Sequence, residues 1–177
     1  MQYITTYSSP VGGILLAADD IGLTGLWFDG EKFYAKSLDP VHTEKEVPVF
    51  KGVKRWLDLY FSGKKPDFMP PVHMIGSAFQ LSVWKILTEI PYGQTTTYGE
   101  IARQIAARRG VDRMSAQAVG GAVGHNEISI IVPCHRVVGT NGSLTGYAGG
   151  VDKKVHLLTL EGVDMSGLFV PATGTAL

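Results

Sequence analysis

The chain has 177 residues, 45% of them hydrophobic and 18% charged, which is enough to build an ordinary hydrophobic core and excludes disorder of the whole chain. No apolar run approaches the roughly 18–20 residues that a membrane-spanning helix needs, and the first residues resemble no secretory signal. The formal net charge is zero, so bulk charge predicts no polyanionic partner, and the single cysteine excludes intramolecular disulfides and multi-cysteine zinc sites. We therefore expect a cytoplasmic protein with no membrane association.

The first third of the chain predicts an antiparallel sheet covered by one helix. Residues 47–62 carry apolar side chains at helical spacing, and Gly63 ends the pattern. Residues 64–71 hold three prolines in eight positions, which is the best candidate for a domain boundary. We expect an amino-terminal α/β domain over residues 1–71, linker included, and a second domain over residues 72–177. The expected strands are residues 3–7, 14–18 and 23–28.

The second part of the chain begins with three predicted helices. Ser77 with Gln80 forms a capping-box pattern before the first helix, and Thr97 with Glu100 repeats it before the second. Ser115 is the expected N-cap of the third. Three short helices in succession suggest a helix-turn-helix.

The third predicted helix, residues 116–124, contains three glycines, each of which costs about 1 kcal/mol of helix propensity relative to alanine. Close packing against another helix would justify the loss. A bare face that lets the backbone approach a ligand or a DNA groove would justify it equally well.

A local excess of positive charge lies between Ile101 and Asn126. The segment contains four arginines and one aspartate, and arginine suits bidentate contacts with phosphate. A solvated helix face accounts for the same pattern.

The last part of the chain mixes apolar runs with turns. Residues 128–132 are apolar and mostly β-branched, so we expect a buried strand that leads into the next segment. Asp152 is the expected cap of a final helix that ends at Glu161. Residues after Val163 lack periodicity, and we expect the extreme terminus to fray.

Cys134 is the candidate nucleophile, although a lone cysteine is more often a small buried hydrophobic residue. It follows Pro133, and its neighbours His135 and Arg136 could accept its proton and stabilise a thiolate. Adjacent residues on a regular strand face opposite sides, so the pair can cooperate only if the strand ends at Pro133 or a water bridges them. Glu161 could orient the imidazole as the third member of a relay.

Other chemistry is less well supported. The five histidines show no i,i+4 pair, so we expect no metal site. No phosphate-loop or dinucleotide-binding glycine motif is present. A cysteine hydrolase would need a base distant in sequence and an oxyanion hole, and neither can be argued from this sequence.

The chain resembles the O6-alkylguanine-DNA alkyltransferase family, also called methylated-DNA–protein-cysteine methyltransferases. The similarity covers about Phe79 to Gly162, whereas the amino-terminal third resembles the family's small domain only in pattern. The motifs that carry the resemblance are Pro133-Cys134-His135-Arg136-Val137, Ile90-Pro91-Tyr92-Gly93, Thr97-Tyr98-Gly99-Glu100, Ala118-Val119-Gly120-Gly121, Asn126, and Gly146-Tyr147-Ala148-Gly149-Gly150 through Lys154 to Glu161-Gly162.

The resemblance implies the roles of five catalytic residues. Cys134 would accept the alkyl group from guanine O6, His135 would take the thiol proton through a water, and Glu161 would hold the histidine. Asn126 would brace the active-site turn. Tyr98 would donate a hydrogen bond to guanine N3 while negative charge develops on the leaving base. The residues that the resemblance places at substrate or DNA are Arg113, Gln117, Gly120, Arg136, Val137, Tyr147, Ala148 and Lys154.

Two features depart from the family pattern. Gln117 stands where an arginine commonly fills the space left by the flipped base. The loop before it is longer than in compact members and carries Arg113, which could compensate for the missing arginine.

The resemblance also implies an α+β fold and a partner. A ribonuclease-H-like sheet with a helix would precede a helical domain of winged-helix or helix-turn-helix type. The protein would act once, as a monomer, on double-stranded DNA containing O6-alkylguanine, with no cofactor and no metal. Two alternatives remain: a lesion-binding protein without transfer activity, whose usual mark is loss of the acceptor cysteine, and a Cys-His hydrolase.

Overall fold

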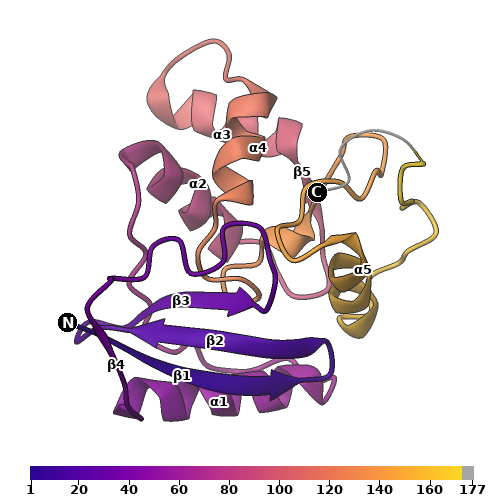
Figure 1. Cartoon of the computed structure of the whole chain (residues 1–177). Helices are drawn as coiled ribbons and strands as arrows, with labels where there is room; N and C mark the ends of the chain where they lie inside the picture. The colour runs from indigo at the N-terminus through magenta and orange to yellow at the C-terminus, as the bar shows by residue number, and fades with distance from the viewer. Residues whose placement is uncertain (173–177) are drawn as a thin grey trace. The chain divides into compact units, whose positions relative to one another are not determined.

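The computed structural model describes Met1–Ala172 and divides the chain into two compact units (Figure 1). The first contains Met1–Ile75 together with Glu127–Ser129, and the second contains Gly76–Asn126 and the chain from Ile130 onward. The boundary expected after residue 71 stays a prediction. Fraying of the extreme terminus concerns residues 173–177 and lies outside the described residues. Within Met1–Ala172, no helix is long and apolar enough to cross a membrane.

The first unit is a four-stranded sheet in the order β3-β2-β1-β4. The predicted antiparallel meander is confirmed, with strands β1 (Gln2–Ser9), β2 (Gly12–Ala18) and β3 (Leu23–Phe28). Strand β4 (His42–Glu44), which pairs parallel with β1, was not predicted. Its three residues are all exposed and polar, so they carry no alternating apolar signal.

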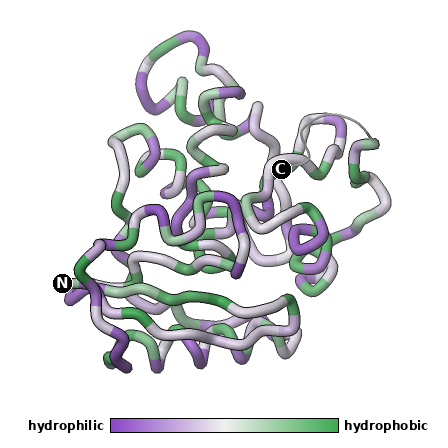
Figure 2. The backbone as a smooth tube through the Cα atoms, in the orientation of Figure 1, coloured by the Kyte–Doolittle hydropathy of each residue, from purple (hydrophilic) through white to green (hydrophobic). Residues whose placement is uncertain are grey.

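Helix α1 (Pro48–Phe61) covers one face of this sheet, as predicted (Figure 1). Gly63 follows its C-cap with φ of +86°, a conformation that favours glycine. The hydropathy colouring shows where the core lies, because β2 and β3 are largely apolar while α1 alternates between apolar and polar residues (Figure 2). The buried residues of α1 are Phe50, Val53, Trp56, Leu57 and Tyr60.

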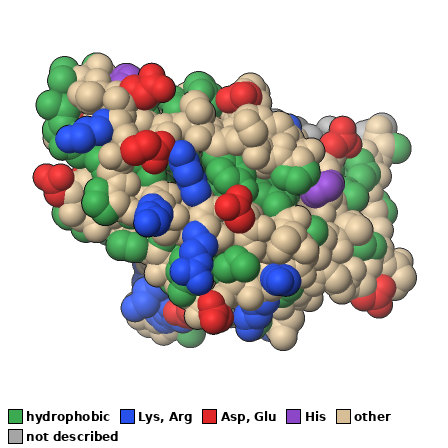
Figure 3. Space-filling view, turned by 90° about the horizontal axis from the view of Figure 1, so that it is seen from below, with side chains coloured by type: hydrophobic (Ala, Val, Ile, Leu, Met, Phe, Trp, Pro, Cys, Tyr) green, Lys and Arg blue, Asp and Glu red, His purple; other side chains and the backbone are tan. Residues whose placement is uncertain are grey.

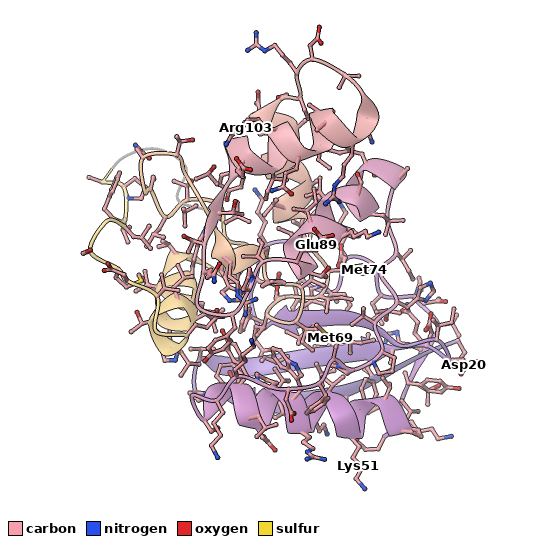
Figure 4. All side chains as sticks on the ribbon, turned by 180° about the vertical axis from the view of Figure 1, so that it is seen from behind. Asp20, Lys51, Met69, Met74, Glu89 and Arg103 are labelled. Atoms are coloured by element: carbon pink, nitrogen blue, oxygen red, sulfur yellow. The ribbon has the colours of Figure 1, made fainter. Side chains whose placement is uncertain are left out.

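The outer face of α1 is mixed in charge. Seen from that side, Lys and Arg side chains alternate with Asp and Glu (Figure 3), and Lys51 points away from the sheet (Figure 4). Lys54 pairs with Glu46 at 2.7 Å. This face therefore has the pattern of an ordinary solvated helix surface.

Glu127–Ser129 pairs with the edge of β3. The Leu26 amide donates to the Glu127 carbonyl at 2.8 Å, the Ser129 amide donates to the Leu26 carbonyl at 3.1 Å, and Trp27 Nε1 donates to Glu127 Oε2 at 2.8 Å. The strand predicted over residues 128–132 is wrong. Only Ile128 forms a bridge with β3, turns follow it, and Ile130 has φ of +69°. A β-branched residue is rarely found in that conformation. The sequence pattern therefore favours a strand, whereas the structure has a turn.

The second unit contains the three predicted helices, α2 (Ala78–Thr88), α3 (Tyr98–Arg109) and α4 (Ala116–Gly124). The capping box at Ser77 is complete, and the hydroxyls of Thr97 and Ser115 each accept an amide hydrogen bond from three residues further on. Trp84 Nε1 on α2 donates to the Ala122 carbonyl on α4 at 2.8 Å. The helices therefore form one packed group.

Two short strands and a last helix complete the second unit. Strand β5 (Thr96–Thr97) pairs parallel with β6 (Val137–Val138), and α5 (Val151–Leu160) follows a loop. The predicted Asp152 cap is wrong: Gly150, with φ of +100°, is the N-cap, and Asp152 lies in the first turn. An aspartate in the first turn still interacts favourably with the helix dipole, which explains why the two positions look alike in sequence.

Candidate active site

Cys134 lies in a tight turn, because Cys134–Arg136 forms a single 3-10 turn, η1. The Cys134 amide donates to the Val132 carbonyl at 2.8 Å, and the buried Asn126 side chain donates to the same carbonyl from Nδ2 at 2.7 Å. With no regular strand at this point, Cys134 and His135 are not held on opposite faces. The local geometry thus removes the difficulty that a strand would have posed.

Glu161 links His135 to Arg136. Its Oε2 lies 2.5 Å from His135 Nε2, and its Oε1 accepts from Arg136 Nε at 2.8 Å. The Gly93 amide donates to Oε1 at 3.0 Å, and Arg136 also donates to the Ile90 carbonyl at 2.7 Å. Since the His135 and Glu161 side chains are completely buried, this network is shielded from bulk solvent.

The electrostatics of this network favour a neutral histidine beside a carboxylate. Burial alone would raise the pKa of Glu161. Hydrogen bonds with His135 and Arg136 outweigh burial, together with the positive charge of Arg136 and that of His135 when it is protonated, and the pKa falls to about 2. Burial lowers the pKa of His135, although Glu161 opposes the shift. At neutral pH the imidazole is therefore available as a proton acceptor.

Lys154 is completely buried, and its ammonium donates to the Val137 carbonyl at 2.5 Å and to the Thr145 carbonyl at 2.8 Å. Burial lowers its pKa to about 8, while a thiolate at Cys134 would act in the opposite direction. Tyr98 donates its hydroxyl to the same Thr145 carbonyl at 3.0 Å. Burial raises the pKa of Tyr98, and a thiolate at Cys134 would raise it further, so the phenol stays protonated as a donor.

The loop that follows β6 lies against these groups. Tyr147 is 1% exposed, and its ring meets the His135 ring edge-on with centroids 6.4 Å apart. A Cβ at Gly146, whose φ is +76°, would lie 2.8 Å from the Tyr98 hydroxyl, so glycine is required there. Ala148 is partly buried in the same loop.

The glycines of α4 are not explained by close packing within the chain. A Cβ at Gly120 would meet the Tyr98 ring at an ordinary 3.8 Å, and Cβ atoms at Gly121 and Gly124 would meet nothing within 4 Å among the described atoms. Close packing against another helix therefore does not explain the glycines at positions 121 and 124. Gln117 is exposed near the start of this helix.

The predicted basic stretch is less positive than its sequence suggests. Arg108 pairs with Glu89 at the end of α2 (Figure 4) at 3.1 Å, and Arg103 pairs with Glu100. Both glutamates precede Ile101 in the sequence, so the positive excess of the stretch after it is partly neutralised in the fold. Arg113 is exposed in the loop before α4 and is the clearest candidate for a phosphate contact.

The structure groups the candidate catalytic residues and gives two others an internal place. Arg136 and Lys154, expected at substrate or DNA, are buried with their donors directed at protein oxygens. Sequence reasoning missed the carbonyls of Ile90 and Thr145 and the amide of Gly93, because backbone groups leave no signature in residue type. Within the described part of the chain, no group of three or more His, Cys, Asp or Glu side chains could hold a metal ion.

Comparison with known proteins gives this geometry a context. Residues 78–163 match the DNA binding domain, and residues 2–74 the ribonuclease-like domain, of 6-O-methylguanine DNA methyltransferase. A methylated-DNA–protein-cysteine methyltransferase from Methanosarcina acetivorans is 45% identical over 161 residues, which are 91% of this chain and 99% of that protein. Its counterpart from Haemophilus influenzae is 42% identical, over 90% of this chain and 86% of the relative.

A solved structure shows the same fold. Mycobacterium tuberculosis OGT in complex with DNA matches with a TM-score of 0.78 and 41% identity, over 96% of each chain. These matches span both units and nearly the full length of the relatives. The chain belongs to the 6-O-methylguanine DNA methyltransferase family.

Proposed function

We propose that Cys134 is the residue that accepts the alkyl group from O6-alkylguanine in double-stranded DNA. As a member of its family, the protein repairs DNA by moving an alkyl group from DNA to a cysteine of its own. One observation carries the assignment: the sequence contains a single cysteine. Its place beside the buried His135–Glu161 pair supports it.

The proposed step is a direct displacement. The Cys134 thiol gives its proton to the imidazole of His135 through a water, and Glu161 stabilises the imidazolium that results. The thiolate sulfur attacks the alkyl carbon, the bond between that carbon and guanine O6 breaks, and its electron pair stays with the guanine. Tyr98, whose hydroxyl otherwise donates to the Thr145 carbonyl, donates to guanine N3 as this charge develops. The product is a thioether, which water does not cleave, so each molecule reacts once.

The DNA side of the proposal uses α4. A base within a duplex cannot reach a buried cysteine, so it must be flipped out at a cost of a few kcal/mol. The Cβ directions of Gly121 and Gly124 are open, so a backbone-only face can enter the minor groove. Gln117 and Arg113 are the side chains we assign to the flipped-base vacancy and to phosphate, and the carbonyl and amide groups of Val137 and Ala148 to the base itself.

The remaining parts of the proposal follow from the same chemistry. A direct displacement needs neither a cofactor nor a metal ion. A single reactive thiol stays reduced in the cytoplasm, where we place the protein. All five proposed catalytic residues come from one chain, so we propose a monomer.

The test is an intact-mass measurement after incubation with a duplex that contains O6-methylguanine. We expect a stoichiometric gain of one methylene unit, located on Cys134 by peptide mapping, and no gain in Cys134→Ser. Duplex binding by Cys134→Ser should stay close to that of the unchanged protein, since the reaction uses the sulfur's nucleophilicity. An unchanged mass with tight lesion binding would indicate a lesion-binding protein instead, and turnover of an ester substrate would indicate a hydrolase.

A further inference from the structure

The segment after α5 is paired with the loop that follows β6. The Phe169 amide donates to the Gly142 carbonyl at 3.1 Å, and the Leu144 amide donates to the Phe169 carbonyl at 2.8 Å. Ser143 and Phe169 form an isolated parallel bridge. The two segments are therefore joined by strand-like hydrogen bonds on both sides of one residue.

An apolar layer lies beneath this pairing. Val138, Leu144 and Leu158 form a buried cluster, so β6, the loop and α5 all contribute to it. The segment after α5 covers that cluster with the side chains of Val163, Met165 and Leu168. Detaching the segment would expose this cluster to water, which makes the pairing more than a loose contact.

The pairing also requires a bare backbone at Gly142. This residue has φ of +90°, and a Cβ there would overlap the carbonyl oxygen of Gly167. A Cβ at Gly167 itself would meet nothing within 4 Å. An added methyl group would therefore disrupt the contact at Gly142 and leave it intact at Gly167.

The loop held in this way leads directly to groups of the proposed site. Leu144 precedes Thr145, whose carbonyl accepts from both Tyr98 and Lys154, and Tyr147 follows two residues later. Cys134 is only 5% exposed, so an alkylated base reaches its sulfur only if neighbouring groups move aside. Residues 139–150 form an irregular segment beside these groups.

We infer that residues 163–170 act as a clamp that fixes the position of the loop over residues 139–150 and thereby limits the size of the alkyl group that Cys134 accepts. The inference rests on the proposed function, because it concerns the pocket in which the transfer takes place. A firmly held loop favours a small group such as methyl, since positioning is retained and little space is opened. A released loop holds the methylated base less precisely but gives room to a larger group.

The test compares Gly142→Ala with the matched control Gly167→Ala. Each protein is given the free bases O6-methylguanine and O6-benzylguanine, and alkylation of Cys134 is followed by intact mass. For Gly142→Ala we expect the ratio of the benzyl rate to the methyl rate to rise at least about tenfold, because a misplacement of about 1 Å can cost about a hundredfold in the rate of the group that depends on it. The Gly167→Ala ratio should equal that of the unchanged protein.

A second pair of variants acts on the hydrogen bond instead of on the close approach. Phe169→Pro removes the amide that donates to Gly142, whereas Phe169→Ala keeps it and shortens an exposed side chain. The ratio should rise in the proline variant alone. Hydrogen exchange at the Leu144 amide, measured on every protein, should be faster in Gly142→Ala and Phe169→Pro only.

The readouts separate the possible failures. A variant that merely folds less well loses active molecules, which lowers both rates and leaves their ratio unchanged. An unchanged ratio in both Gly142→Ala and Phe169→Pro overturns the clamp, as does an unchanged exchange rate at Leu144. Failure of the unchanged protein to alkylate Cys134 from either base or from duplex DNA would overturn the proposed function itself.

Discussion

Lys154 shows how a single buried charge can be read in stability measurements. Its folded-state pKa of about 8 lies below its ordinary value of 10.5 because the ammonium is buried. Between these values the unfolded chain binds more protons than the folded one, so the stability of the fold rises with pH. We expect the free energy of unfolding to increase by about 2 kcal/mol between pH 8 and about 9.5, since a difference of one bound proton changes it by about 1.36 kcal/mol per pH unit.

Lys154→Met isolates this effect. The variant should lose the rise between pH 8 and about 9.5, which urea denaturation at a series of pH values would reveal. The upper limit stays below the range in which Tyr98, with its raised pKa, would begin to act in the opposite direction. A variant with the same slope as the unchanged protein would show that another group causes the pH dependence.

At the scale of residues, chemistry could be predicted further than location. Cys134, His135 and Glu161 were identified from residue type and motif, and the structure brings His135 and Glu161 within 2.5 Å. The resemblance to the family places Arg136 and Lys154 at substrate or DNA, whereas the structure buries both side chains. Their partners include the backbone carbonyls of Ile90, Val137 and Thr145, whose positions depend on tertiary packing.

At the scale of elements, α4 offers a test of its open glycine face. Gly121 is exposed and lies within α4, and a Cβ added there would meet nothing within 4 Å among the described atoms. Gly121→Ala should therefore stabilise the fold by about 0.5–1 kcal/mol through helix propensity. If this face enters a DNA groove, the same change should weaken duplex binding.

Thermal unfolding and duplex titration measure these two effects separately. Gly52→Ala, on the helix of the first unit, is the matched control, because its Cβ would also meet nothing within 4 Å. It should stabilise the fold without any effect on DNA binding. Equal duplex affinities for Gly121→Ala and Gly52→Ala would contradict a groove-facing α4.

Gln117 belongs to the same helix and concerns base flipping. A glutamine can hydrogen-bond an orphaned cytosine, but it lacks the length, planarity and charge with which arginine stacks in a negatively charged groove. Gln117→Arg should therefore speed the reaction with duplex DNA and leave the reaction with the free alkylated base nearly unchanged. Gln117→Ala should slow the duplex reaction alone.

Single-turnover rates with the two substrates decide whether Gln117 acts in flipping. Equal changes in both rates would place its effect in the pocket, and no change in either would direct attention to Arg113 in the preceding loop. The free base is the control in each variant, because it needs no flipping.

The elements themselves could be predicted where local signals agree. The caps at Ser77, Thr97 and Ser115 are each confirmed, because a hydroxyl at the N-cap satisfies an amide that the helix leaves open. Strand β4 forms through its pairing with β1. Its three polar residues carry no apolar pattern from which a strand could be predicted. Residues 128–132 were misread because their β-branched run favours a strand, whereas the fold requires a turn at Ile130.

At the scale of the whole molecule, the path of the chain could not be predicted from sequence pattern. The chain leaves the second unit at Asn126, adds three residues to the sheet of the first, and returns at Ile130. The hydrogen bond between Trp27 and Glu127 joins residues 100 positions apart. The local hydrophobic pattern cannot predict such a pairing, because it depends on contacts that form only when distant parts of the chain have folded together.

This excursion of the chain gives the last prediction. Glu127 is partly buried, and Trp27 Nε1 donates to its carboxylate at 2.8 Å, so Trp27→Phe leaves the carboxylate without that donor. We expect a double-mutant cycle with Trp27→Phe and Glu127→Ala to give a coupling of about 1.5–3 kcal/mol in urea denaturation, typical of a hydrogen bond to a charged group. Glu127→Gln, which keeps an acceptor oxygen, should lower the free energy of unfolding much less than Glu127→Ala does. The alkylation rate should fall with stability in Trp27→Phe, because the chain runs directly from this segment into the turn that carries Cys134. A coupling near zero would mean that the backbone bonds of Leu26 alone hold Glu127–Ser129 on the sheet.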